Sequence, residues 1–263
     1  MTDDPGRPGR AAEDGSPYPD RASPTFERDV RRMFTHIAGR YEWFDHLASV
    51  GNDFLWRPMS LWALDRFRAD RPVRRVLDVG CGTGEFSRWA LRHYPESTVV
   101  SADFTGAMVA RARALAGKLA PRTTAVRATV RRLPFADGSF DLVLNAFVVR
   151  NLTDLDGSLA EMRRVLVDGG SLVTLEISEP PNRLVRSLFH AYFDHVVPWL
   201  GRSVHSSGPY RYLPESLRSL PAREEIVRRL GAAGFDPVRA VRFSQGIVTA
   251  YLARARGGSG PSR

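Results

Sequence analysis

The stretch Arg75-Val76-Leu77-Asp78-Val79-Gly80-Cys81-Gly82-Thr83-Gly84-Glu85-Phe86 decides the fold of this chain. It begins with a short apolar run, which predicts a buried strand. Three glycines at alternate positions then end the strand, and the pattern from Glu85 to Tyr94 is helical. The stretch therefore predicts a strand, a glycine turn and a helix, the opening unit of an α/β fold.

Toward the carboxyl end, the alternation of strand and helix continues. Four further segments have the composition of buried strands, and two helical patterns lie among them. Such alternation predicts a doubly wound, mostly parallel sheet with helices on both faces. The predicted strands are Thr98–Phe104, Thr123–Val130, Phe140–Phe147 and Ser171–Ser178, and the predicted helices are Ala107–Leu119 and Leu155–Val167.

The last part of the chain departs from this alternation. After Pro180 we expect a helical insertion over residues 181–220, with its main helix at about Leu184–Leu200, and then a helix at Glu224–Leu230. We expect this insertion and the helices at the front of the chain to form an apolar entrance to the ligand site that is predicted below.

Two strand patterns close the chain. Val238–Phe243 and Ile247–Ala253 are divided only by Ser244-Gln245-Gly246, which is too short for a helical crossover. We therefore expect them to pair antiparallel as a C-terminal hairpin, which completes a sheet of seven strands.

The segment before the first strand is predicted to be a helical cap over residues 26–70. Apolar residues recur there at three- and four-residue spacing, and most of its tryptophans are expected to pack between the cap and the main domain. Residues 1–25 and 257–263 are rich in small and polar residues and are predicted to be disordered tails. We therefore expect a single domain over residues 26–256.

Composition and charge exclude several classes of protein. The 263 residues are 43% hydrophobic and 25% charged, close to the globular average. Cys81 is the only cysteine, so no intrachain disulfide and no cysteine-built zinc site can form, and no metal site is predicted. Without a long apolar run or a secretory segment, a cytoplasmic location is expected. The net charge of +9 suits an anionic partner, but the arginines form no compact basic run and no nucleic-acid partner is expected.

The glycine loop predicts a nucleoside-containing ligand, because Gly80, Gly82 and Gly84 let a ligand approach the bare backbone. A dinucleotide fingerprint would need a glycine where Glu85 stands, which disfavours NAD. S-adenosylmethionine fits better, since it carries a sulfonium and an ammonium that match Asp78 and Glu85. Thr83 could add a hydroxyl contact.

Asp103 ends the second predicted strand, about twenty residues after the glycine loop. A carboxylate at this position can accept hydrogen bonds from both ribose hydroxyls. A glycine triplet alone is often only a turn, and such an aspartate is often a helix cap. Together, in a strand–loop–helix–strand context, they favour a nucleoside site.

These features, with motifs elsewhere in the chain, resemble the ubiquinone/menaquinone C-methyltransferase (UbiE/MenG) family of class I S-adenosylmethionine-dependent methyltransferases. The resemblance covers about Phe26 to Tyr251. The glycine loop is generic to methyltransferases, whereas the segment from Tyr41 to Trp56, the pair Arg150-Asn151 and Tyr210-Arg211-Tyr212-Leu213 are more specific.

The resemblance implies a Rossmann-like methyltransferase that uses S-adenosylmethionine to methylate a ring carbon of a polyprenylated quinol. It assigns Thr83 and Asp103 to the cofactor and Thr129-Val130 to the adenine edge. The sequence departs from the family at Thr129, where Asp or Asn is usual. Further departures, which bear more on the substrate than on the reaction class, are Glu42, Asp45, Asp53 and Ala146.

Arg150 and Asn151 follow the fourth predicted strand, at the edge where open α/β sheets bind ligands. Arg150 could stabilise a developing phenolate while Asn151 orients the hydroxyl or a water. Alternatively, Arg150 forms a structural salt bridge and Asn151 caps a turn; spacing leaves both readings open and the resemblance favours the first. On that reading, Arg150→Ala keeps its fold and loses turnover. Tyr41 is a candidate for the wall of the quinol site, or else a core aromatic.

Methylation of demethylmenaquinol to menaquinol is the function that the resemblance favours. A ubiquinone precursor, a soluble phenolic substrate and a non-catalytic nucleoside- or RNA-binding role are the alternatives. An insoluble prenyl tail and a cationic chain predict peripheral contact with an anionic membrane, at the inner face of the cell membrane. A homodimer is left open.

Overall fold

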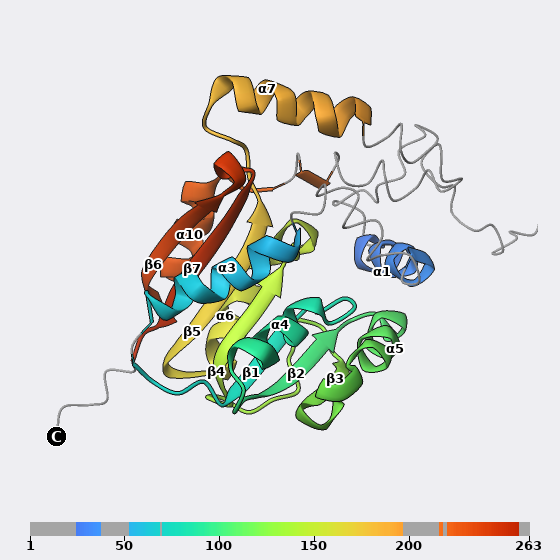
Figure 1. Cartoon of the computed structure of the whole chain (residues 1–263), viewed down its shortest axis with the longest axis vertical. Helices are drawn as coiled ribbons and strands as arrows, with labels where there is room; N and C mark the ends of the chain where they lie inside the picture. Colours follow the sequence, from blue (N-terminus) through green and yellow to red (C-terminus); the bar gives the residue numbers. More distant parts are fainter. Residues whose placement is uncertain (1–24, 38–52, 69, 197–215, 218–219, 258–263) are drawn as a thin grey trace, which may run out of the picture.

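The computed structural model describes residues 25–37, 53–68, 70–196, 216–217 and 220–257 (Figure 1). Within this part of the chain, seven strands form one sheet in the order β3-β2-β1-β4-β5-β7-β6. The strands are β1 (Arg75–Val79), β2 (Thr98–Asp103), β3 (Thr123–Arg127), β4 (Phe140–Ala146), β5 (Leu166–Ile177), β6 (Phe235–Phe243) and β7 (Val248–Ala255).

The first five strands are parallel, and β7 runs antiparallel to β5 on one side and to β6 on the other. The predicted C-terminal hairpin is therefore confirmed, with β7 inside the sheet and β6 at its edge. The mostly parallel α/β architecture of the sequence analysis is confirmed as well.

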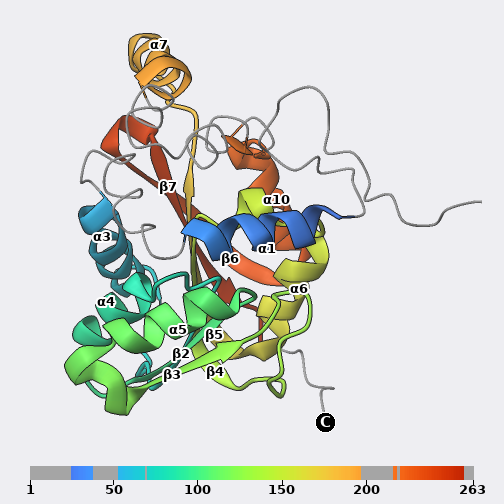
Figure 2. The same ribbon diagram turned by 90° about the vertical axis from the view of Figure 1, so that its right-hand side faces the viewer.

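Helices cover both faces of the sheet, with α3, α4 and α5 on one face and α6 and α10 on the other (Figure 2). Each face has its own buried cluster, because alternate residues of a strand point in opposite directions. On β1, for example, Val76 packs in the cluster that includes α3 and α4, and Leu77 packs in the cluster that includes α6 and α10. The helices named here are α3 (Asp53–Asp65), α4 (Glu85–His93), α5 (Gly106–Leu115), α6 (Leu155–Val165) and α10 (Arg223–Ala232).

Two further helices lie at the end of the sheet where the parallel strands finish, α1 (Phe26–Ile37) and α7 (Arg183–Ala191) (Figure 1). Phe26 and Val30 of α1 are buried, whereas Leu184 and Leu188 of α7 are largely exposed. In the part of the chain that the structure describes, no helix combines the length and apolar character needed to cross a membrane.

Three predicted boundaries were wrong for identifiable reasons. The helix predicted to reach Leu119 ends at Leu115, because Gly117 adopts a φ of +52° and a short 3-10 helix follows. The third strand ends at Arg127, since Thr129 turns back to bridge Arg132. The helix predicted to end at Val167 stops at Val165, and β5 begins at the next residue with no connecting loop.

Two further expectations need correction. In the insertion, the α-helix predicted over Leu184–Leu200 ends at Ala191 and continues as a π-helix, Tyr192–Val196. Of the tryptophans expected to pack under the cap, Trp56 is buried, but Trp62 is 57% exposed.

Candidate functional site

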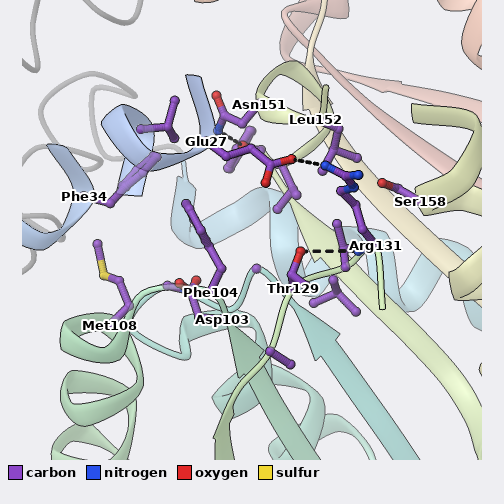
Figure 3. A pocket seen from close by; sticks show the side chains of 18 of the residues that line it. Glu27, Phe34, Asp103, Phe104, Met108, Thr129, Arg131, Asn151, Leu152 and Ser158 are labelled. Atoms are coloured by element: carbon purple, nitrogen blue, oxygen red, sulfur yellow. Dashed lines mark hydrogen bonds and ion pairs between the residues drawn. The ribbon is translucent and has the colours of Figure 1, made fainter. Parts of the chain in front are cut away.

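A cavity opens at the carboxyl ends of β1 to β4 and is covered by α1 (Figure 3). Its empty space, including the part that is open to solvent, is about 860 Å³. Figure 3 shows Glu27 and Phe34 of α1 on one side of this space and Asp103 and Phe104, from the end of β2, on another. We call it the main pocket.

The glycine loop forms the floor of the main pocket. Gly80, Gly82 and Gly84 all have positive φ angles, of +64°, +53° and +79°, which side chains rarely tolerate. A Cβ atom on Gly80 would lie 2.6 Å from Cγ2 of Val148, so the backbone is bare there by necessity. Gly80 and Gly82 line the main pocket, whereas Gly84 precedes α4.

Asp103 links two loops at the pocket floor. One carboxylate oxygen accepts from the backbone N–H of Gly82 (3.0 Å), and the other accepts from the N–H of Thr105 (2.8 Å). A carboxylate offers about four lone-pair positions, so two remain for further donors such as ribose hydroxyls. The group is only 6% exposed, and burial raises its pKa.

Thr129 and Val130 also line the main pocket, in the turn that follows β3. The Thr129 hydroxyl accepts from the backbone N–H of Arg131 at 3.5 Å. Phe104 and Met108 add an apolar surface nearby (Figure 3). This end of the pocket can therefore hold a flat aromatic base, and the turn offers both polar and apolar contacts to its edge.

Helix α1 is held over the main pocket by a polar contact. Glu27 accepts from Nη1 of Arg131 at 2.8 Å and from Oγ1 of Thr153 at 2.9 Å. The hydrogen bond from Arg131 holds the pKa of Glu27 below its usual range. This contact ties α1 to the loops that follow β3 and β4.

Beyond the glycine loop lies a smaller recess, lined in part by Asp78, Thr83 and Glu85. It shares Gly80 and Gly82 with the main pocket, so the two spaces meet at the loop. Asp78 is 1% exposed and accepts from both the backbone N–H (3.0 Å) and the hydroxyl (2.6 Å) of Ser87. Burial raises the pKa of Asp78 to about 6, although the bonds from Ser87 and the charge of Arg57 oppose the rise.

Asn151 and Arg150 lie side by side in a short 3-10 helix (Val149–Asn151) but have different surroundings. Asn151 lines the main pocket (Figure 3), and its amide donates to the carbonyl of Phe147 at 3.5 Å. Arg150 is buried, and its Nη1 lies 2.6 Å from Oε1 of Glu176 on β5. Arg150 is not among the described residues that line the main pocket.

The remaining features considered in the sequence analysis are Tyr41, Cys81 and metal binding. Tyr41, predicted for the quinol wall, lies outside the described residues. Cys81 is buried, and burial raises the pKa of its thiol. Among the described residues, no group of His, Cys, Asp and Glu side chains could hold a metal ion.

Sequence reasoning missed the residues that reach the site from helices packed over the sheet, namely Glu27, Val30 and Phe34 of α1 and Arg57 of α3. It also missed Phe104, although this residue directly follows Asp103. An apolar side chain next to a strand-end aspartate was the available signal for Phe104. No local spacing marks the helix residues, because their positions depend on tertiary packing.

The chemistry of the two connected spaces fits S-adenosylmethionine. Asp103 has acceptor positions for a ribose, the bare glycines admit the chain that joins ribose to sulfur, and the Asp78 and Glu85 carboxylates suit positive charge. The nucleoside portion would be held by Asp103, Gly80, Gly82, Thr129 and Val130. The methionine portion would lie beside Asp78 and Thr83.

Comparison with known proteins gives consistent results. A family model described as the ubiE/COQ5 methyltransferase family matches residues 23–254. A demethylmenaquinone methyltransferase of Thermus thermophilus is 39% identical over 221 residues, 84% of this chain and 98% of the relative. One of Deinococcus radiodurans is 40% identical over 207 residues, 78% of this chain and 84% of the relative.

Among solved structures, a SAM-dependent methyltransferase from Aquifex aeolicus has a similar fold, with a TM-score of 0.58 and 18% identity. The match covers 81% of this chain and 97% of that chain. This likeness supports the Rossmann-like methyltransferase fold.

Proposed function

Because this chain belongs to the ubiE/COQ5 methyltransferase family, and is thus an S-adenosylmethionine-dependent methyltransferase, we propose that it converts demethylmenaquinol to menaquinol. Two relatives that match over most of their length carry the name demethylmenaquinone methyltransferase, which favours this quinol over a ubiquinone precursor. Other relatives are named ubiquinone/menaquinone biosynthesis C-methyltransferase, so a ubiquinone precursor is the second candidate.

The observation that carries the proposal is the wall of the main pocket next to Asn151. Phe34, Phe147, Val148 and Leu152 contribute apolar side chains there, and Asn151 is a polar group among them. A hydroxylated ring system matches this arrangement, because the apolar wall binds the ring and the amide fixes one of its hydroxyls. We propose that Asn151 is the residue that touches the reacting quinol.

The cofactor, when bound, would supply a methyl group on a positively charged sulfur. The quinol ring carbon would gain this methyl group and lose its hydrogen as a proton, and the sulfur would leave as the neutral thioether of S-adenosylhomocysteine. Ring carbons become nucleophilic as the neighbouring hydroxyl loses its proton. Asn151 would donate to the oxygen as negative charge builds on it, and the apolar wall would exclude water. Tyr41 remains a proposed contact of the quinol.

For Arg150 we propose a positioning role. Its guanidinium is paired with Glu176, and its backbone N–H also donates to Glu176 (3.3 Å), so the pair holds the turn that carries Asn151. The guanidinium carbon also lies 5.5 Å from the centre of the Phe147 ring, which lines the main pocket. Direct contact between Arg150 and the quinol oxygen, predicted from the resemblance, stays a prediction.

The test is a reconstituted reaction with the purified protein, S-adenosylmethionine and chemically reduced naphthoquinones, analysed by mass spectrometry. We expect one methyl group to be added to a demethylated naphthoquinol that carries a prenyl tail. A demethylated benzoquinol precursor of ubiquinone and an unprenylated phenol should react far more slowly. Preference for either of these would overturn the assignment. Asn151→Ala should lose turnover but retain binding of S-adenosylhomocysteine.

We also propose that the protein collects its substrate at a membrane surface. Leu184 and Leu188 of α7 are 70% and 64% exposed, and Arg183, Arg186 and His190 lie on the same helix. Exposed apolar side chains beside basic ones are typical of a helix that lies in the interface of an anionic bilayer.

Vesicle flotation tests this membrane contact. The protein should float with anionic vesicles, less so at high salt, and should not float with neutral ones. Leu184→Gln/Leu188→Gln should float much less than the parent, while Arg228→Gln, on α10, should behave like the parent. Equal flotation of the leucine variant and the parent would contradict the assignment to α7.

A further inference from the structure

The recess beyond the glycine loop contains a buried ion pair between Arg57, which has no role so far, and Glu85, which was matched above only to the positive charge of the cofactor. Arg57 of α3 is 5% exposed, and its Nη1 lies 3.1 Å from Oε2 of Glu85, at the start of α4. Both residues line the recess with Asp78 and Thr83. An arginine from the helix before β1 thus meets an acid from the first helix after it.

The geometry of Glu85 indicates that its carboxylate can accept a further hydrogen bond from a ligand. Its carboxylate uses Oε2 for Arg57, whereas Oε1 is buried and accepts no hydrogen bond from the residues that the structure describes. A buried acceptor without a donor is costly, so such atoms in folded proteins commonly receive one from a ligand or water.

Neighbouring groups hold Arg57 where it is. Its guanidinium carbon lies 5.6 Å from the centre of the Phe147 ring, at the boundary with the main pocket. The preceding residue, Trp56, donates from Nε1 to Oγ of Ser244 at 2.8 Å, which ties α3 to the turn between β6 and β7. Arg57 is therefore a preorganised cation, with little side-chain freedom to lose on binding.

The charges in the recess match one particular chemical group. Arg57 offers a cation, and Glu85 and Asp78 offer carboxylates, so the recess presents both signs with one negative charge in excess. An α-amino acid is a zwitterion with an ammonium and a carboxylate on one carbon atom. In S-adenosylmethionine the nearby sulfonium adds one positive charge, which balances the excess.

We propose that the Arg57–Glu85 pair recognises the amino-acid end of the cofactor. Arg57 donates to the α-carboxylate, and Oε1 of Glu85 accepts from the α-ammonium. The pair thereby discriminates the intact cofactor and its product from adenosine derivatives that lack the amino acid. This role concerns the cofactor alone and does not depend on which quinol is methylated.

Calorimetry with two ligands tests the proposal. S-adenosylhomocysteine carries the amino-acid group, and 5′-methylthioadenosine has the same nucleoside and sulfur without it. The quantity to compare is the ratio of their dissociation constants. A purely structural role of Arg57 would change both affinities and leave this ratio unaltered.

In the parent protein, S-adenosylhomocysteine should bind more tightly than methylthioadenosine. Arg57→Met should reduce this preference about 10- to 100-fold, as expected for losing a hydrogen-bonded charge partner. Arg57→Lys should retain more of the preference than Arg57→Met, because it keeps the charge. Arg228→Met, which removes an arginine from an exposed ion pair on α10, is the matched control and should leave the preference unchanged.

The double variant Arg57→Met/Glu85→Gln covers the case in which Arg57→Met does not fold, since it also removes the Glu85 charge that Arg57 pairs with. It should fold, bind methylthioadenosine like the parent, and show the same loss of preference for S-adenosylhomocysteine. An unchanged preference in the folded variants, whether or not both affinities fall, would overturn the proposal.

Discussion

Replacement of Arg150 gives the sharpest test of what its buried ion pair does. Glu176 is 0% exposed, and its carboxylate accepts a hydrogen bond from Nη1 of Arg150 at 2.6 Å. It also accepts from the backbone N–H groups of Arg150 (3.3 Å) and Ile177 (3.0 Å). Arg150→Met removes the only cation among these donors and leaves a carboxylate in the protein interior. Breaking such a pair typically costs about 3–5 kcal/mol of folding free energy.

The control is Arg150→Met/Glu176→Gln, which replaces the pair by neutral side chains of similar size. Since a neutral replacement of a buried pair is often tolerated, the double variant should recover most of the stability that the single variant loses. Guanidinium unfolding of parent, single and double variants measures this recovery, and calorimetry with S-adenosylhomocysteine shows whether the cofactor site is intact.

Sequence analysis alone expects Arg150→Ala to keep its fold and lose turnover, and the buried pair reverses this expectation. The reasoning is refuted if Arg150→Met loses less than about 1 kcal/mol of unfolding free energy while turnover falls about 100-fold or more. That outcome would mean that the guanidinium acts on the quinol oxygen directly.

Three further perturbations follow from the site. Asp103→Asn should weaken binding of S-adenosylhomocysteine about 10-fold or more, as measured by calorimetry. The NH2 group of the new asparagine would face one of the two backbone N–H donors, at Gly82 or Thr105. Equal affinity would contradict the assignment of Asp103 to the cofactor. Asp78 has a folded-state pKa of about 6, above the unfolded value of 3.8, so its contribution to stability is greatest when it is protonated and falls as pH rises from about 4 to 6. Relative to the parent, Asp78→Asn should therefore gain about 2 kcal/mol of unfolding free energy between pH 4 and 7, and a pH-independent difference would count against the raised pKa. Glu27→Gln weakens the exposed contact that ties α1 to Arg131, so stopped-flow release of S-adenosylhomocysteine should be faster than in the parent. An unchanged rate would show that α1 does not limit release.

The sequence predicts the central sheet well because the relevant signals are local. The run from Arg75 to Gly84 includes the glycines that form its turn. One strand–helix–strand unit then sets the separation in sequence between this turn and Asp103. Asp103, Gly80 and Gly82 therefore lie together at the main pocket.

Other features depend on contacts between segments distant in sequence. Arg150 pairs with Glu176 on the neighbouring strand, and a single sequence does not reveal which acid lies opposite this arginine. Arg57 and Glu27 reach the site only because α3 and α1 pack against the sheet and its loops. The boundary at Val165 was missed because a helix that passes directly into a strand has no turn residues to mark it.

The position of β7 in the sheet affects how the chain folds while it is being synthesised. Among the strands that the structure describes, β7 is the last in sequence, yet it lies between β5 and β6 and is buried along most of its length. While a ribosome is still synthesising the C-terminal residues, the edge of β5 has no partner and stays open to pairing with other chains. Polypeptides that end before Val248 should therefore aggregate, and we expect a tag placed after Ala255 to be better tolerated than a truncation that removes β7.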